Sequence, residues 1–228
     1  MKTVIVALLS VLFLFAPIVV RAESDGIEKI EASIDVLKEI MAVPEKDIPP
    51  TLLSNATGVA IIPHVVKAGL IIGGRYGTGV LLVHDKDGRW SNPSFITITG
   101  GSIGWQIGVE AMDIVMVFKN EKSINLMLSG KFTLGVDASV AAGPVGREVS
   151  AATDIQLKSE IYSFSRTKGL FAGLSLGGSV IQIDDETNER VYGERGILAR
   201  DIFSNKQLKA PAPAETLKKM LTEYTSMK

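Results

Sequence analysis

The amino-acid sequence predicts an α+β protein: a β-rich core of antiparallel strands, sandwich or barrel-like, with an N-terminal amphipathic helix and C-terminal helices. Between residues 59 and 192, short apolar or alternating runs are separated by glycines and turn residues, which is typical of antiparallel strands. No helical pattern alternates with these runs, so a doubly wound parallel sheet is not expected. Apolar residues at helical spacing precede and follow this region.

The first 22 residues have the three-part pattern of a cleavable secretory signal. Lys2 is followed by an uninterrupted apolar run over residues 4–20, and Val20-Arg21-Ala22 places small residues at the two positions that a signal peptidase reads. A membrane anchor is the alternative, but a run of 17 residues is at the lower limit for spanning a bilayer. We therefore expect a mature protein that begins near Glu23 and is periplasmic or secreted.

The composition limits the kind of partner. Without residues 1–22, which contain Lys2 and Arg21, 206 of the 228 residues remain and the formal charge falls from −1 to −3. Nucleic-acid binding usually requires clustered positive charge, so no nucleic-acid partner is expected. The chain has no cysteine, which excludes disulfides and lipoprotein acylation and leaves stability to the core of a single domain.

Residues 24–43 are predicted to form the N-terminal amphipathic helix. Its apolar residues recur at spacings of three and four, which places them on one face: Ile27, Ile30, Ile34, Leu37, Ile40 and Met41. The opposite face is mainly acidic, whereas helices that lie on membranes usually carry basic residues. We therefore expect the helix to dock on the domain; a membrane-contacting helix is the alternative.

Strands are predicted near residues 59–62, 69–73, 79–84, 95–99, 103–109, 112–118, 131–141, 154–164, 170–174 and 178–184. The clearest is 131–141, where apolar and polar residues alternate with a period of two. Segments 85–88 and 184–188 are predicted to be hairpin turns. Helices are predicted at 194–204 and after Pro213. The predicted organisation is a signal peptide over 1–22, one domain over 23–205 and a C-terminal helical tail over 206–228.

The sequence shows no pattern of a catalytic or metal-binding site. The two histidines, His64 and His84, have no second ligand at a spacing that zinc sites use. Segment 85–88 begins like a calcium loop but lacks the acidic residue at the twelfth position. The glycine-rich segments 73–79 and 100–108 match neither phosphate-binding motif, and there is no G-x-S-x-G elbow. We therefore expect no enzymatic activity, no metal and no cofactor.

A succession of short motifs is more specific. WSNPSF occupies residues 90–95, GPVGR residues 143–147 and YSFSRTKGLFAG residues 162–173, and Tyr192-Gly193 follows. In this order and spacing the motifs resemble the SYLF domain family, over roughly residues 27–205. The resemblance implies lipid binding and, in fungal and animal members, actin binding.

The candidate binding residues are cations and aromatic or apolar neighbours, a combination that suits an anionic headgroup beside acyl chains. They are Lys67, Arg75, Tyr76, Arg89, Trp90, Arg147, Arg166 and Lys168. Trp105 is a further aromatic candidate for an interface. We predict a non-enzymatic protein of the cell envelope that contacts phospholipid or a membrane surface. The alternative is a structural or protein-interaction module, similar to the actin-binding members, that contacts an envelope protein and no lipid.

Overall fold

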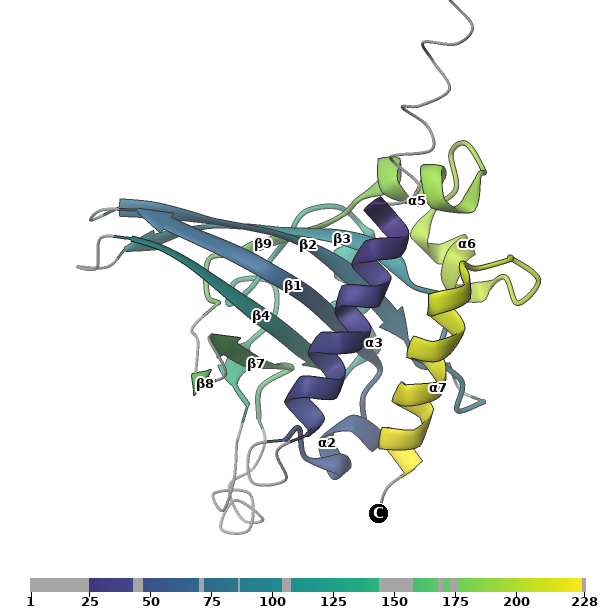
Figure 1. Cartoon of the computed structure of the whole chain (residues 1–228), viewed down its shortest axis with the longest axis horizontal. Coiled ribbons are helices and arrows are strands. Elements are labelled where there is room, and N and C mark those ends of the chain that lie inside the picture. The colour runs from purple at the N-terminus through teal and green to yellow at the C-terminus, as the bar shows by residue number, and fades with distance from the viewer. Residues whose placement is uncertain are drawn as a thin grey trace, which may run out of the picture.

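The computed structural model describes residues 25–42, 47–69, 72–85, 87–103, 108–143, 158–167, 170–172 and 176–226. Over these residues, one curled and mostly antiparallel sheet is flanked by helices from both ends of the chain (Figure 1). The predicted α+β class with a β-rich antiparallel core is confirmed, and the sheet curls as a half-barrel.

The sheet has nine strands within the described residues. In chain order they are β1 (Gly58–Gly69), β2 (Ile72–Val83), β3 (Ser94–Ile103), β4 (Gly108–Phe118), β5 (Phe132–Thr133), β6 (Val140–Ala142), β7 (Ile161–Thr167), β8 (Leu170–Ala172) and β9 (Val180–Ile183). Their order across the sheet is β5-β9-β3-β2-β1-β4-β7-β6, and β8 also pairs with β7. The four long strands therefore have the order 3-2-1-4, which is that of a Greek key.

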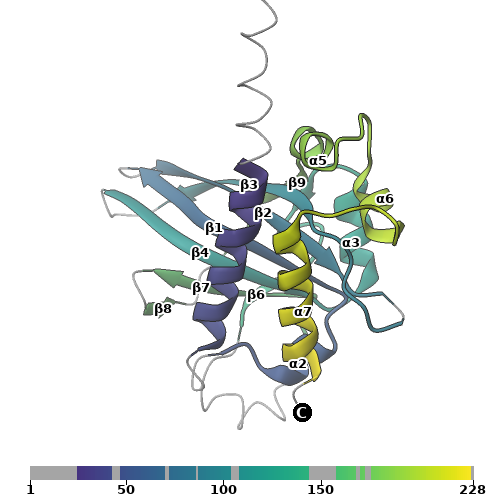
Figure 2. The same ribbon diagram turned by 45° about the vertical axis from the view of Figure 1, so that its right-hand side comes forward.

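The helices are residues 25–41, α2 (Pro50–Ser54), α3 (Glu121–Leu128), α5 (Asp185–Tyr192), α6 (Ala199–Ser204) and α7 (Ala212–Ser226). Helix 25–41 and α7 lie side by side over one face of the sheet, which we call the outer face (Figure 2). No helix in the described part of the chain is long and apolar enough to cross a membrane.

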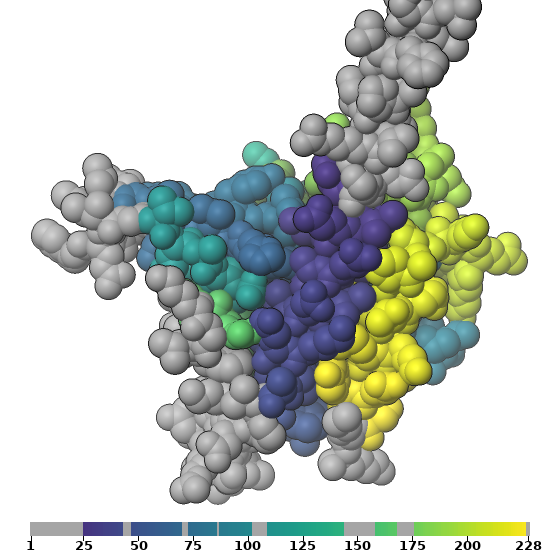
Figure 3. All heavy atoms as spheres, viewed as in Figure 1, coloured from purple at the N-terminus to yellow at the C-terminus, as the bar shows by residue number. Residues whose placement is uncertain are grey.

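Apolar side chains pack on both faces of the sheet. On the outer face, Val80 and Val115 belong to the same buried cluster as Ile30 and Leu37 of helix 25–41. Both helix residues are completely buried, and the helix forms a continuous surface with α7 (Figure 3). The apolar stripe of the N-terminal helix is therefore largely part of the core, as expected for a docked helix.

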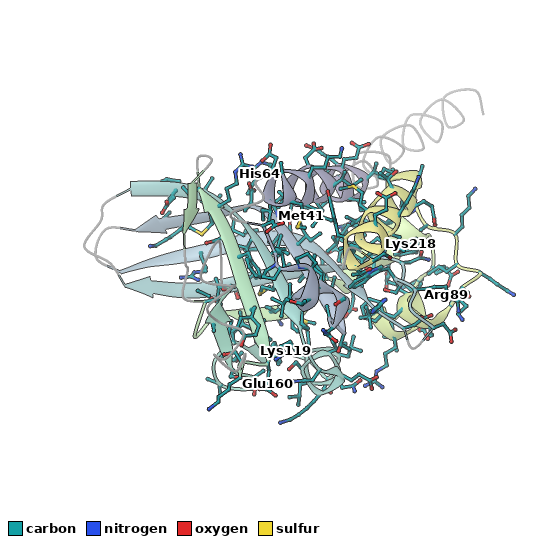
Figure 4. The ribbon with its side chains drawn as sticks, turned by 90° about the horizontal axis from the view of Figure 1, so that it is seen from below. Met41, His64, Arg89, Lys119, Glu160 and Lys218 are labelled. Atoms are coloured by element: carbon teal, nitrogen blue, oxygen red, sulfur yellow. The ribbon has the colours of Figure 1, made fainter. Side chains whose placement is uncertain are left out.

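The C-terminal helix α7 belongs to the same core. Leu217 and Leu221 are fully buried. Lys218 Nζ (Figure 4) donates to Asn92 Oδ1 at 2.9 Å, and Asn92 Nδ2 donates to the Leu208 carbonyl at 2.9 Å. The segment after residue 205 is thus a packed layer of the domain, joined by polar contacts to the chain just before β3.

A β-bulge bends the centre of the sheet. Between Ile62 and Val65, two residues of β1, Pro63 and His64, lie opposite the single residue Asp113 of β4. His64 has a φ of 50°, and its N–H donates to Asp113 Oδ1 at 2.9 Å. An extra residue in one strand increases its bend and local twist, so this bulge contributes to the curl of the sheet.

The WSNPSF segment attaches α5 to the sheet. Asn188 of α5 is fully buried, and its Oδ1 accepts a hydrogen bond from the Phe95 N–H at 2.9 Å. The Tyr192 hydroxyl donates to the Pro93 carbonyl at 2.6 Å. Burial raises the pKa of the Tyr192 phenol, which keeps this donor protonated. The motif that carries the family resemblance therefore has a structural role in this fold.

The strand predicted over residues 131–141 is interrupted. β5 ends at Thr133, the chain turns through Gly135 at a φ of 81°, and β6 begins at Val140. The Asp137 carboxylate accepts a hydrogen bond from the Thr133 N–H at 2.6 Å. This prediction was wrong because a glycine and a local side-chain bond form a turn inside an alternating apolar pattern.

The segment 184–188 begins α5 instead of forming a hairpin turn. Asp184 Oδ1 accepts from the Thr187 N–H at 3.0 Å, and Gly193 ends the helix at a φ of 68°. No helix is predicted from the sequence over residues 121–128, where the structure has α3. The N-cap of this helix is Asn120, whose side chain accepts a hydrogen bond from the Ser123 N–H at 2.9 Å. Helices this short have too few apolar residues for a clear period, so their caps are the better sequence signal.

Other predicted bounds shift. The predicted strand 69–73 covers the end of β1 and the start of β2, and 103–109 covers the end of β3 and the start of β4, with residues 70–71 and 104–107 outside the described residues. Residues 154–157 are also outside them, and β7 begins at Ile161. The helix predicted over 194–204 is α6, which begins only at Ala199.

Candidate binding surface

The central strands project beyond their neighbours at one end of the sheet (Figure 1). Within the described residues, β9 pairs with β3 over 96–99, and β7 pairs with β4 over 113–118. Farther along, the strand pairing in the described part of the chain involves only β1 to β4. We call residues 66–69, 72–76, 100–103 and 108–111 the distal end.

The outer face of the distal end exposes uncharged side chains. Val66, Tyr76 and Val109 are 42%, 57% and 77% exposed. The register places Tyr76 and Ala111 beside Val66, and Val109 beside Ala68. We call these five residues the outer patch. It continues the face that helix 25–41 covers farther along the strands, and Figure 3 shows strand surface extending beside that helix.

The two candidate cations of the distal end lie on the opposite, inner face. Lys67 pairs in register with Arg75 on β2 and with Glu110 on β4. Burial lowers the pKa of the Arg75 guanidinium, which nevertheless stays charged at neutral pH. The structure thus brings three predicted site residues, Lys67, Arg75 and Tyr76, to one end of the sheet, with the tyrosine and the cations on different faces.

Arg89 and Trp90 lie at the other end of β2. Trp90 is 6% exposed and stacks on His84 with ring centroids 4.7 Å apart. Arg89 forms ion pairs with Asp85 and Asp87 of the same turn. In this structure the tryptophan is a core residue and the arginine (Figure 4) belongs to a surface turn.

Arg166 is on β7, where it forms an ion pair with Glu39 and so connects this strand to helix 25–41. Arg147 and Lys168 lie outside the described residues, as does Trp105. The described candidates therefore occupy three separate places, and only the distal end combines cations with exposed apolar groups.

A groove of about 450 Å³ adjoins the outer patch, and no sequence motif indicates it. Glu28 and Lys29 of helix 25–41 line one side, Arg190 of α5 lines another, and Tyr76 of β2 links the groove to the outer patch. Residues of helix 25–41, β1, β2, β3 and α5 line it, so only the tertiary structure brings them together.

A second cavity, of about 380 Å³, lies between α3, β9 and α6. Its lining includes Leu128, Lys131, Arg200 and the 57% exposed Leu198. In the described part of the chain, no group of three or more His, Cys, Asp or Glu side chains could hold a metal ion. The surfaces that stand out in this structure are therefore apolar patches and grooves with a few charges at their margins.

Comparison with known proteins identifies relatives of this chain. The family model described as "Ysc84: Las17-binding protein actin regulator" matches residues 99–224. SH3 domain-containing YSC84-like protein 1 of Xenopus laevis is 35% identical over 83% of this chain and 58% of its own length. Protein YSC84 of Saccharomyces cerevisiae is 40% identical over 76% of this chain and 37% of its own length. LAS seventeen-binding protein 3 of the same species is 35% identical over 84% of this chain and 42% of its own length.

The chain thus spans between about a third and three fifths of the length of these relatives. Their names describe binding proteins and a regulator, and not enzymes. Because the family model covers more than half of the chain, and the motifs at residues 90–95 and 192–193 had already indicated the same family, the resemblance is confirmed. The chain belongs to the Ysc84 family of SYLF-domain proteins.

Proposed function

We propose that this protein is a non-enzymatic lipid-binding protein that contacts phospholipid through the distal end of its sheet. The outer patch is the observation that carries the proposal. Its three large side chains, Val66, Tyr76 and Val109, are exposed together on one face of the projecting strands. Contiguous exposed apolar residues commonly mark an interaction surface, and a tyrosine suits the boundary between water and hydrocarbon.

The charges around the patch support a phospholipid surface. Lys67 and Arg75 belong to the same distal end, on the opposite face of the strands, and their long side chains can reach anionic headgroups at the tip of the sheet when the outer patch touches the membrane. The segments that join these strands, 70–71 and 104–107, contain no charged residue. The N-terminal helix supports contact through the sheet instead, because its apolar residues are largely used in the core.

Liposome flotation tests the proposal. A chain that begins at Glu23 retains every residue that the structure describes, and we expect it to float with vesicles of bacterial phospholipids, zwitterionic and anionic. The double variant Tyr76→Ser/Val109→Ser is expected to bind about 100-fold more weakly. Two such side chains that become buried in the bilayer on binding contribute about 3 kcal/mol to the binding free energy. Raising the salt concentration should weaken the part of the binding that comes from Lys67 and Arg75.

The matched control is Leu126→Ser/Val136→Ser. These residues are 38% and 77% exposed and lie outside the distal end. The control variant should float like the unmodified chain. Equal flotation of both double variants, or no flotation of the unmodified chain with any lipid, would refute lipid contact through the outer patch.

The proposal includes export. We expect protein recovered from the periplasm or the medium of expressing bacteria to begin at Glu23, because the Val20-Arg21-Ala22 sequence fits signal peptidase. Intact-mass spectrometry measures this directly. Protein that stays in the membrane fraction with residues 1–22 attached would show an anchor instead of a cleaved signal.

The second candidate is a protein-interaction module. It is favoured by the relatives, which are named as Las17-binding proteins and an actin regulator. For an exported chain the partner would be an envelope protein, and the cavity beside Leu198, lined by both apolar and charged residues, offers a surface for it. Crosslinking in living cells would then recover one defined partner, with a yield that Tyr76→Ser/Val109→Ser leaves unchanged.

A further inference from the structure

The groove beside the outer patch is lined by charged side chains of both signs, and some of them form no ion pair with another described residue. In the described part of the chain, Asp25, Glu28 and Lys29 form no ion pair, although all three line the groove. They occupy the first two turns of helix 25–41, where Asp25 and Glu28 are exposed and Lys29 is half-buried. The helix therefore presents two carboxylates and one ammonium group to the same space.

On the opposite side of the groove, the polar side chains at the start of α5 and Arg190 form hydrogen bonds with one another. Asp184 accepts hydrogen bonds from Thr187, from its N–H at 3.0 Å and from its hydroxyl at 2.8 Å. Arg190 bonds to Glu186 and, at 2.8 Å, to the Thr187 hydroxyl. This side is consequently a fixed polar wall, and the available charges come mainly from the N-terminal helix.

The floor connects the groove to the outer patch. Tyr76 belongs to both, and Thr78 and Phe95 continue the floor on the same face of the sheet. His64, held in the β-bulge, lines the groove with an exposed side chain; Figure 4 shows it near helix 25–41. A volume of about 450 Å³ is within the range of small-molecule sites.

We propose that this groove binds the zwitterionic headgroup of a phospholipid, an amine joined to a phosphate, while the acyl chains lie along the outer patch. Asp25 and Glu28 face the amine, and the Tyr76 ring adds an aromatic surface that attracts a cation. Lys29 supplies the positive charge for the phosphate. This inference rests on the proposed lipid contact and adds the headgroup class, which a surface with cations alone would not select.

Charge complementarity decides between headgroup classes. A headgroup with only negative charge would leave the two carboxylates of the helix unpaired and facing a like charge. An amine-phosphate headgroup matches both signs at once. The proposal therefore predicts selection for phosphatidylethanolamine over phosphatidylglycerol, the reverse of what basic surface patches favour.

Titration with dihexanoyl phospholipids below their micelle concentration tests this. Amide shifts in the nuclear magnetic resonance spectrum of the chain beginning at Glu23 report both affinity and position. We expect the ethanolamine lipid to bind at least tenfold more tightly than the glycerol lipid, because one charge-assisted hydrogen bond changes an affinity by about a factor of ten. The shifts should be centred on Lys29, His64 and Tyr76.

Two variants and a control assign the charges. Glu28→Gln is expected to remove most of the preference for the ethanolamine lipid, and Lys29→Gln to weaken both lipids about tenfold. Glu31→Gln, on the same helix but outside the groove lining, should change neither. Equal or tighter binding of the glycerol lipid, or a preference that survives Glu28→Gln, would overturn the proposal. The proposal would also be overturned if a basic peptide shifted the amide signals of the groove and neither lipid did.

The two lipid proposals fail in different ways. Glycerophosphoethanolamine has no acyl chains, so its binding reports the groove alone, whereas flotation of Val66→Ser/Val109→Ser reports the outer patch alone, because neither residue lines the groove. Binding of this headgroup together with unchanged flotation of the variant would support the groove and refute the patch. Flotation that depends on the patch without any headgroup binding would refute the groove and leave the proposed function standing.

Discussion

Replacing Gly79 with alanine is expected to destabilise the fold by about 3 kcal/mol or more, the upper range for overpacking a core. A Cβ at this position would lie 2.1 Å from the Ile61 carbonyl oxygen and 2.7 Å from the Ile62 Cα. Both are backbone atoms, so no side-chain rotation can relieve the contact. Gly79 lies opposite the β-bulge, where β1 and β2 shift register between Ile61 and Val66.

Thermal unfolding measures this effect. For a chain of this size, 3 kcal/mol corresponds to a fall in Tm of about 10 °C. Gly74→Ala is the control on the same strand, because its Cβ would meet only the Gly100 oxygen at 3.9 Å. The control should unfold near the temperature of the unmodified chain. A Gly79→Ala variant as stable as the control would show that the bulge can relax, and that the bend of the sheet does not depend on this glycine.

Replacing Asn188 with leucine is expected to cost about 3 kcal/mol, since it removes a buried hydrogen-bonding group and leaves its partners unsatisfied. Asn188 Oδ1 accepts from the Phe95 N–H at 2.9 Å, and its Nδ2 donates to Ser94 Oγ at 3.1 Å. Ser94 and Asn188 are both fully buried, so water cannot replace the lost bonds without opening the contact between α5 and β3.

Chemical denaturation gives the free energy of unfolding for this variant. Asn125→Leu is the control: Asn125 is exposed on α3, and its substitution should change stability by less than about 0.5 kcal/mol. Hydrogen exchange adds a local reading, because the Phe95 amide should lose protection in Asn188→Leu. Unchanged protection of that amide would contradict the role assigned to Asn188.

Both predictions concern the support of the binding surface. The bulge around His64 bends the strands that end in the outer patch, and α5, held by Asn188, forms one wall of the groove. Neither substitution replaces a side chain proposed to contact lipid, because Gly79 lines the groove without a side chain and Asn188 is not part of the groove lining. Any loss of lipid binding in these variants should therefore follow the fraction of unfolded protein, which separates support from direct contact.

The family motifs illustrate how far recognition from sequence reaches. WSNPSF and Tyr192-Gly193 indicated the family correctly. In the structure, Pro93 and Phe95 bond to Tyr192 and Asn188, so these motif residues hold α5 against the sheet. A motif can thus identify a domain through its scaffold while carrying no information about the ligand.

The candidate site was predicted only in part. Lys67, Arg75 and Tyr76 are close in sequence and are adjacent in the sheet, because a hairpin brings neighbouring strands into register. The charge of Arg166 makes it a candidate in the sequence, yet in the structure it is paired with Glu39, a residue 127 positions away. Such pairings leave no local pattern, so sequence reasoning could not separate exposed cations from those used to join elements.

The sequence by itself determined the β-rich core, the docked amphipathic helix and the family, because periods of two and of about 3.6 residues and the order of motifs are local properties of the chain. Only the tertiary structure decided the curl of the sheet, the projection of its distal end and the groove. These depend on contacts such as His64 with Asp113 and Phe95 with Asn188, across 49 and 93 residues. A local pattern specifies which face of each element is apolar, whereas the folded arrangement specifies which of those faces is left uncovered.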